Sequence, residues 1–96
     1  MITVKVHTIL DIKKVVGKRE VQIVLPPGST VADLLEQMVK SWGEGLSSLL
    51  FEVDSHKLFS HIQIMVNGRA IAFLSGMGTE IADGDEVLIL PPVAGG

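Results

Sequence analysis

The amino-acid sequence predicts a small α+β domain, in which a mixed sheet of about five strands carries one main helix on one face. Three observations lead to this prediction. Several short segments alternate apolar and polar residues, one segment has the apolar spacing of an amphipathic helix, and Gly- or Pro-containing turns separate them. The length of 96 residues suits one domain with a core of its own. We therefore treat residues 1–96 as a single domain.

Two strands are predicted before the helix. Residues 1–10 alternate, and the apolar face is formed by Ile2, Val4, Val6 and Leu10. Residues 11–18 carry mixed charge and reach Gly17, which predicts the loop of an open hairpin. Residues 20–25 resume the alternation until Pro26 and Pro27 stop the strand, because proline has no N–H to donate to a neighbouring strand.

Residues 31–42 predict the main helix. Its apolar positions recur at helical spacing and are Val31, Leu34, Leu35, Met38, Val39 and Trp42. Thr30 and Asp33 have the spacing of a capping box, and Gly43 is a natural stop. Residues 44–60 are harder to interpret, although the apolar residues at 46–51 could form a short helix that adds to the core.

The second half of the sequence is predicted to form the remaining strands. Residues 61–66 alternate, Asn67-Gly68 favours a type I′ turn, and residues 69–73 return as a short strand. Residues 74–82 are irregular, and residues 83–85 form a turn before the last strand at 86–90. Pro91 and Pro92 end that strand, so residues 91–96 are predicted to form an extended C-terminal tail.

Composition argues against several classes of site. The chain has no cysteine, which excludes disulfides, thiolate metal sites and cysteine nucleophiles. Its three histidines lack metal-ligand spacing, so we expect no metal site. A net charge of −3 does not favour nucleic acid, and no apolar run approaches the ~20 residues of a membrane span. We expect a cytoplasmic protein with no membrane partner and no signal peptide.

The C-terminal residues are the strongest candidate for a functional site. A Gly-Gly end arises by chance in about one chain in a hundred at this glycine content. The alternative is a frayed tail. However, Pro91 and Pro92 stiffen the exit from the last strand, and Val93 and Ala94 are modest apolar groups that a groove can hold. Gly95 and Gly96 have no Cβ, so they could pass through a narrow channel and deliver the carboxylate of Gly96 into another protein's active site.

A free carboxylate of this kind can be activated as an acyl-adenylate by an enzyme that uses ATP. A sulfur nucleophile can then displace AMP and leave a thiocarboxylate, or an amine can displace it and leave an amide. In either case the chain is a carrier or a tag that binds no cofactor of its own.

Two segments near the C-terminus form a paired signature: residues 83–87, Asp-Gly-Asp-Glu-Val, followed by residues 90–96, Leu-Pro-Pro-Val-Ala-Gly-Gly. In this signature the chain resembles the small, sulfur-carrying subunit of molybdopterin synthase, the MoaD-like family, which is related to ubiquitin and to the thiamine-pathway carrier ThiS. Weaker support comes from residues 25–31 and 66–68. The chain departs from the family at His7 and around Leu10, and Leu90 stands where Phe is common.

The resemblance implies a ubiquitin-like β-grasp fold and a complex with a large, MoaE-like synthase subunit. It further implies that an E1-like, MoeB-like enzyme adenylates Gly96 with ATP, and that a cysteine desulfurase or rhodanese system supplies the sulfur. The thiocarboxylate would then give its sulfur to cyclic pyranopterin monophosphate, which becomes the dithiolene of the molybdenum or tungsten cofactor.

Two alternatives stay open. The chain could carry sulfur for thiamine, cysteine or tRNA thiolation, or modify other proteins. It could also be a non-covalent ubiquitin-like binding module in which the two glycines are incidental.

A partner interface is predicted on the side of the sheet opposite the helix. The strand alternation assigns Met65, Leu88 and Leu90 to that face, where exposed apolar residues suggest contact with a partner. His7 should lie near them, because the resemblance places the first and last strands side by side. Alternatively, residues 44–60 could fold over this face.

Overall fold

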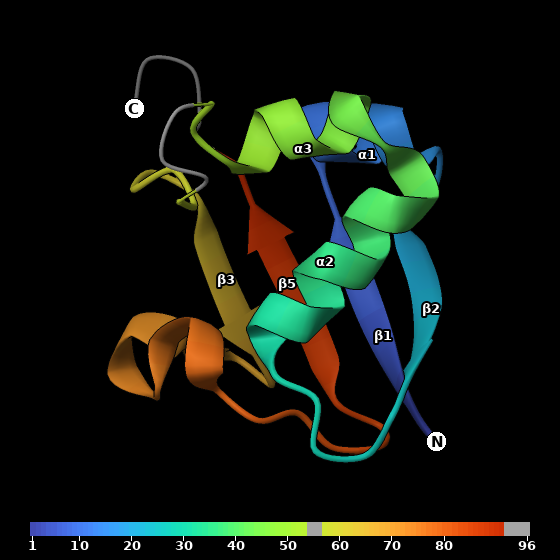
Figure 1. The fold of residues 1–96 in the computed structure, drawn as a ribbon, viewed down its shortest axis with the longest axis vertical. Helices are drawn as coiled ribbons and strands as arrows, with labels where there is room; N and C mark the ends of the chain where they lie inside the picture. Colours follow the sequence, from blue (N-terminus) through green and yellow to red (C-terminus); the bar gives the residue numbers. More distant parts are fainter. Residues whose placement is uncertain (54–56, 92–96) are drawn as a thin grey trace.

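A computed structural model of the chain describes residues 1–53 and 57–91 (Figure 1). These residues form one five-stranded mixed sheet with the strand order β2-β1-β5-β3-β4. The strands are β1 (Ile2–Thr8), β2 (Glu20–Leu25), β3 (Gln63–Val66), β4 (Arg69–Ala70) and β5 (Glu86–Leu90). β1 and β5 are parallel neighbours, and the other neighbouring strands are antiparallel. The mixed sheet predicted from the sequence is confirmed.

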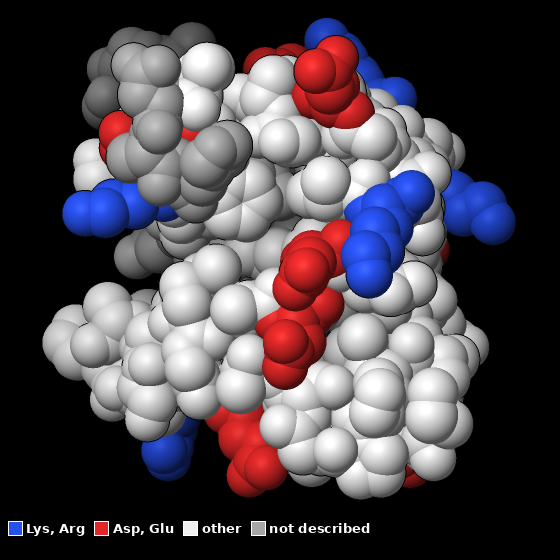
Figure 2. All heavy atoms as spheres, viewed as in Figure 1, with Lys and Arg blue, Asp and Glu red and all other residues white. Residues whose placement is uncertain are grey.

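The main helix, α2 (Val31–Trp42), lies across one face of the sheet (Figure 1). It begins with the predicted capping box: the Thr30 hydroxyl accepts a hydrogen bond from the Asp33 backbone N–H, and the Asp33 carboxylate accepts one from the Thr30 N–H. Val31, Leu34, Leu35 and Met38 are fully buried. The outer side of α2 carries charged residues of both signs, which Figure 2 shows as the polar surface of a solvated helix.

A second helix, α1 (Leu10–Val16), occupies the segment for which the sequence predicted a hairpin loop. That prediction is wrong. Ile12 and Val16 are spaced i, i+4 and are both buried, so a short amphipathic turn adds them to the core. Gly17 ends the helix in the left-handed conformation, with φ 87°.

The predicted extension of the first strand to Leu10 is also wrong. β1 ends at Thr8, whose side chain is buried and whose hydroxyl donates a hydrogen bond to the Lys18 carbonyl. Leu10 is exposed and has φ 53°, so it cannot belong to a strand.

A third helix, α3 (Glu44–Leu50), confirms the short helix considered for the segment after Gly43. Leu46 and Leu50 are fully buried in the same core as α2, and α3 contacts both α1 and α2. Phe51 pairs with Leu58 in an isolated bridge, and both side chains pack against that core. The described part of residues 44–60 therefore lies with the helices, and the alternative in which it covers the opposite face is not supported.

The segment after β3 confirms one prediction and corrects another. Asn67 and Gly68 have φ values of 50° and 84°, as a type I′ turn requires. However, the returning strand stops at Ala70 instead of continuing to residue 73. The chain turns there into a 3₁₀ helix (Ile71–Phe73), which brings Ile71 into the core, and a second such helix spans Gly76–Gly78. Within the described ranges, no helix is long and apolar enough to cross a membrane.

Candidate functional site

The face of the sheet turned away from α2 keeps several apolar side chains partly accessible. Along β5, Val87 and Ile89 are fully buried, whereas Leu88 and Leu90 between and after them are half-buried. β1 and β3 show the same alternation, which leaves His7 and Met65 half-buried. We call His7, Met65, Leu88 and Leu90 the docking patch. None of them belongs to the core or to the partly buried residues packed against it.

The register of the central strands brings three patch residues into one row. Leu88 pairs with His7 on β1 and with Met65 on β3, while Leu90 pairs with Gln63 one step further along. Directly opposite residues on neighbouring strands project from the same side of a sheet. The structure therefore places the four residues on one face of the sheet, and their role as a partner interface stays a prediction.

Acidic side chains border the docking patch. A hollow of about 370 Å³ is lined by residues of β1, β3 and β5 and of the Asn67-Gly68 turn, including His7, Leu88 and Glu86. The His7 Nε2 atom lies 2.8 Å from Glu86 Oε1, and its Nδ1 atom lies 3.7 Å from Glu20 Oε1. A partner that covers the apolar row would therefore meet carboxylates at its edge, which favours Lys or Arg on the partner.

This acidic border was not predicted from the sequence. Glu20 and Glu86 are far apart in the sequence and become neighbours only because β1 lies between β2 and β5. The alternation within residues 20–25 and 86–90 places both glutamates on the face away from the helix. Together with the expected pairing of the first and last strands, this alternation could have identified them.

The turn before β5 fixes the position of the strand. The Thr3 N–H donates to Asp83 Oδ1 at 2.7 Å, and the Ala82 N–H donates to Asp85 Oδ2 at 2.8 Å. Asn67 links the same turn to the β3–β4 turn, because its Nδ2 donates to Asp85 Oδ1 at 2.9 Å. Gly84 has φ 87°, a conformation that glycine adopts readily. Asp83 and Asp85 therefore serve the turn, as expected, and do not form a pair of catalytic carboxylates.

The described residues show no other arrangement of side chains that suggests a catalytic or metal site. No group of three or more His, Asp or Glu side chains in residues 1–53 and 57–91 is placed to hold a metal ion. Every buried side-chain N or O atom that the structure describes has a hydrogen-bond partner.

The predicted tail begins at the end of β5. Pro91 is buried and is the last residue that the structure describes. The remaining tail residues named from the sequence, Pro92, Val93, Ala94, Gly95 and Gly96, lie outside the described residues. The docking patch therefore extends to the residue directly before the tail, since β5 ends at Leu90 and Pro91 follows it.

Comparison with protein families gives one clear result. Residues 11–96 match the model described as the ThiS family. Among individual relatives, small archaeal modifier protein 3 of Haloferax volcanii is 36% identical over 84 residues, which are 88% of each chain. The sulfur carrier protein CysO of Mycobacterium tuberculosis is 39% identical over 70 residues, which are 72% of this chain and 74% of the relative.

Solved structures confirm the ubiquitin-like β-grasp fold. The crystal structure of small archaeal modifier protein 1 from Haloferax volcanii matches with a TM-score of 0.85 and 33% identity, covering 98% of this chain and 99% of that one. A putative molybdopterin converting factor, subunit 1, from Pyrococcus furiosus gives 0.77 and 32%, covering 97% and 100%. The BexX/CysO complex of Amycolatopsis orientalis gives 0.74 and 29%, covering 97% and 99%.

Proposed function

This chain belongs to the ThiS family of ubiquitin-like sulfur carriers, and from that premise we propose that its working group is the carboxylate of Gly96. The observation that carries the proposal is the continuity of β5. This strand contributes Leu88 and Leu90 to the docking patch and leads directly through Pro91 to the Gly-Gly end. A partner bound at the patch would therefore hold the root of the tail and direct its last residue.

The proposed chemistry starts with activation by an E1-like adenylating enzyme. A Gly96 carboxylate oxygen attacks the α-phosphorus of ATP, and pyrophosphate leaves. Sulfide, or a sulfur donor that supplies its equivalent, then attacks the acyl carbon and displaces AMP. The product is a thiocarboxylate, in which one oxygen of Gly96 has been replaced by sulfur.

Cysteine-free composition fits this role. A thiolate on the carrier could attack the activated end of the same or another chain, and this sequence has no thiol to do so. The carrier provides the acyl group and the recognition surface, while the adenylating and acceptor enzymes provide the catalytic residues.

We assign the sulfur to the dithiolene of molybdopterin. In this assignment a large, MoaE-like subunit binds the docking patch. The thiocarboxylate sulfur of Gly96 displaces an oxygen substituent from a carbon of cyclic pyranopterin monophosphate and forms an S-acyl intermediate. Water then hydrolyses the bond between the sulfur and the acyl carbon, which returns Gly96 to a carboxylate and leaves the sulfur on the pterin. Because a dithiolene contains two sulfur atoms, two thiocarboxylated chains are consumed for each product. The similarity to the putative molybdopterin converting factor subunit from Pyrococcus furiosus and the Pro91-Pro92 pair support this assignment.

Attachment to other proteins is the second candidate. It is favoured by the similarity to small archaeal modifier proteins 1 and 3 from Haloferax volcanii. In this case a lysine amine displaces AMP from activated Gly96 and forms an isopeptide bond. The same docking patch and tail would serve both outcomes, because both begin with adenylation.

Reconstitution distinguishes the two acceptors. The thiocarboxylated chain is mixed with the large subunit encoded in the same genome and with cyclic pyranopterin monophosphate. Formation of molybdopterin, with conversion of Gly96 back to a carboxylate, supports the first assignment. If no molybdopterin forms while cell extracts contain Gly96-linked conjugates, the first assignment is wrong and the second is supported.

A further inference from the structure

Leu10 adopts a backbone conformation that its side chain disfavours. Outside the glycines, positive φ occurs in the described residues at Leu10 and at Asn67. Asn67 belongs to a type I′ turn, and asparagine tolerates the left-handed region. A leucine does not, because its Cβ crowds the following carbonyl oxygen. Glycine or asparagine at position 10 would form the same bend with less strain.

The fold gives no reason for a leucine at this position. Leu10 is 51% exposed, and its neighbour Ile9 is 36% exposed. Neither belongs to the described core or to the partly buried residues packed against it. A strained residue whose apolar side chain remains in solvent suggests a function for that side chain. We call Ile9 and Leu10 the β1 elbow.

The β1 elbow lies beside the root of the tail. β1 and β5 are parallel, with Thr8 paired to Ile89, so Ile9 and Leu90 follow at the same end of the sheet. Ile9 is still extended, with φ −139° and ψ 164°. Because side chains alternate along an extended chain, Ile9 continues on the side of His7, the side of the docking patch.

The reach of the tail limits where an enzyme can bind. Residues 92–96 follow Pro91, and five residues span at most about 18 Å. An enzyme that holds the Gly96 carboxylate must therefore approach the end of the sheet where β1 and β5 finish. The β1 elbow lies on that rim.

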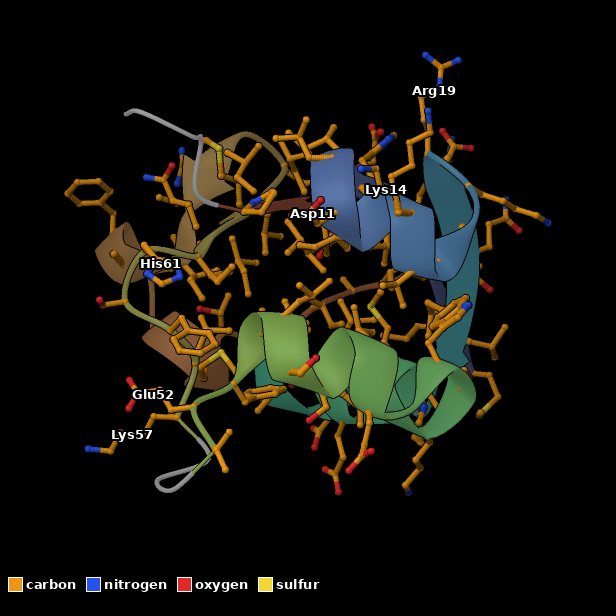
Figure 3. All side chains as sticks on the ribbon, turned by 90° about the horizontal axis from the view of Figure 1, so that it is seen from above. Asp11, Lys14, Arg19, Glu52, Lys57 and His61 are labelled. Atoms are coloured by element: carbon orange, nitrogen blue, oxygen red, sulfur yellow. The ribbon has the colours of Figure 1, made fainter. Side chains whose placement is uncertain are left out.

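The surroundings of the elbow are basic in a chain of net charge −3. Half of its eight Lys and Arg residues follow within nine positions of Leu10, at Lys13, Lys14, Lys18 and Arg19. All four are exposed. The acidic residues of the same segment are Asp11, 3.8 Å from Lys14, and Glu20, which pairs with His7. Figure 3 shows Asp11 and Lys14 on α1 and Arg19 on the following turn, projecting outward. A partner surface that is complementary to the elbow and its basic neighbours would have an apolar pocket bordered by carboxylates.

We infer that the β1 elbow is a recognition site for the adenylating enzyme, which takes Leu10 into an apolar pocket bordered by acidic residues. The inference rests on the proposed function. This enzyme is the expected partner because adenylation of Gly96 precedes transfer to every proposed acceptor. The enzyme must also enclose the tail to reach the carboxylate.

The test uses ATP–pyrophosphate exchange with the adenylating enzyme encoded in the same genome. Leu10→Asn keeps a residue that tolerates the left-handed bend and removes the apolar side chain. We expect thermal stability equal to or above that of the native chain. We also expect KM for the carrier to rise about tenfold or more, with the rate at saturation kept within about twofold.

Val24→Thr is the matched control. Val24 is also an exposed apolar residue, 53% accessible, but it pairs with Thr3 near the opposite end of β1. Its substitution should leave KM unchanged. Combined charge reversal at Lys13 and Lys14 should raise KM at low salt and have less effect at high salt.

Three results would overturn the inference. An unchanged KM for Leu10→Asn would mean that the elbow does not contact the adenylating enzyme. A clear loss of thermal stability would show that Leu10 serves the fold. Weaker binding to the acceptor subunit with normal exchange would assign the elbow to another partner. If the native chain supports no exchange at all, it is the proposed function that fails.

Discussion

The two faces of β5 differ in what covers them, although they are formed by alternate residues of the same five-residue strand. Val87 and Ile89 face the helices and are fully buried. Leu88 and Leu90 face the other way and are half-buried, outside the core and the residues packed against it. All four are apolar, so composition alone would not separate them.

Burial within the domain therefore explains why the residues on one side of β5 are apolar, but it does not explain the leucines on the other side. The core already contains a continuous layer between the sheet and the three helices. Polar residues at positions 88 and 90 would suit a solvated face, as Glu20 and Gln22 do on β2. The two leucines fit the proposal that this surface contacts another protein. Substitutions on the buried face should therefore lower the stability of the domain, whereas substitutions on the other face should mainly weaken binding to a partner.

The largest loss of stability is expected from the buried face. Ile89→Ala removes a fully buried side chain between β1 and β3, which should lower the free energy of unfolding by about 2–5 kcal/mol. Urea unfolding measures this loss. Leu88→Ala, the neighbouring position on the other face, should cost about 1 kcal/mol. Equal losses at the two positions would contradict the distinction between the faces.

Leu90→Lys should affect binding instead of folding. A charge in the docking patch should weaken the complex with the large synthase subunit by about 2 kcal/mol, roughly thirtyfold in Kd. The free chain should unfold at the same urea concentration as the native one, because Leu90 lies outside the core. Isothermal titration calorimetry measures the affinity. An unchanged Kd would remove Leu90 from the interface.

Asn67→Ala should have an intermediate effect on stability. Asn67 donates to Asp85, accepts from the Glu86 N–H at 2.9 Å and has φ 50°. Loss of these contacts, with alanine in a left-handed conformation, should cost about 1–2 kcal/mol in urea unfolding. Asn67→Gly keeps the backbone freedom and should lose less. If both variants lose the same amount, the hydrogen bonds alone account for the effect.

Gly95→Val should change stability least. The position lies in the tail beyond the described residues, and the sequence predicts few contacts with the core, so thermal unfolding should stay within about ±0.5 kcal/mol of the native chain. Activation should nevertheless fail, because the added side chain would obstruct a narrow channel. Normal adenylation of this variant would refute the requirement for glycine.

Sequence patterns predicted the strand faces and the main helix because those elements have long, consistent periodicity. The last strand is apolar on both sides. The alternation shows that Val87 and Ile89 share one side and that Leu88 and Leu90 share the other, but the buried side could be identified only by assigning the helix to one face of the sheet. The docking patch followed from that assignment and from the resemblance that pairs the first and last strands. The Thr30–Asp33 capping box and the Asn67-Gly68 turn were predictable because each depends on a few adjacent residues.

Shorter elements escaped prediction for physical reasons. α1 spans two turns, and its apolar residues Ile12 and Val16 gain stability from contact with distant parts of the chain. The bend at Leu10 could not be foreseen, because leucine is a poor candidate for positive φ. The returning strand ended early because burial of Ile71 competes with continuation of an edge strand. The acidic border of the docking patch depends on strand order, which local patterns do not determine.

The central claim is that Gly96 carries the transferable sulfur. The most direct measurement is the intact mass of the chain after incubation with the adenylating enzyme, ATP and sulfide, with a chain that lacks Gly96 as the control. We predict that one oxygen is replaced by sulfur in the native chain, that fragmentation locates the change at Gly96, and that the shortened chain is unmodified. An unchanged mass of the native chain, or equal modification of the shortened one, would contradict the claim.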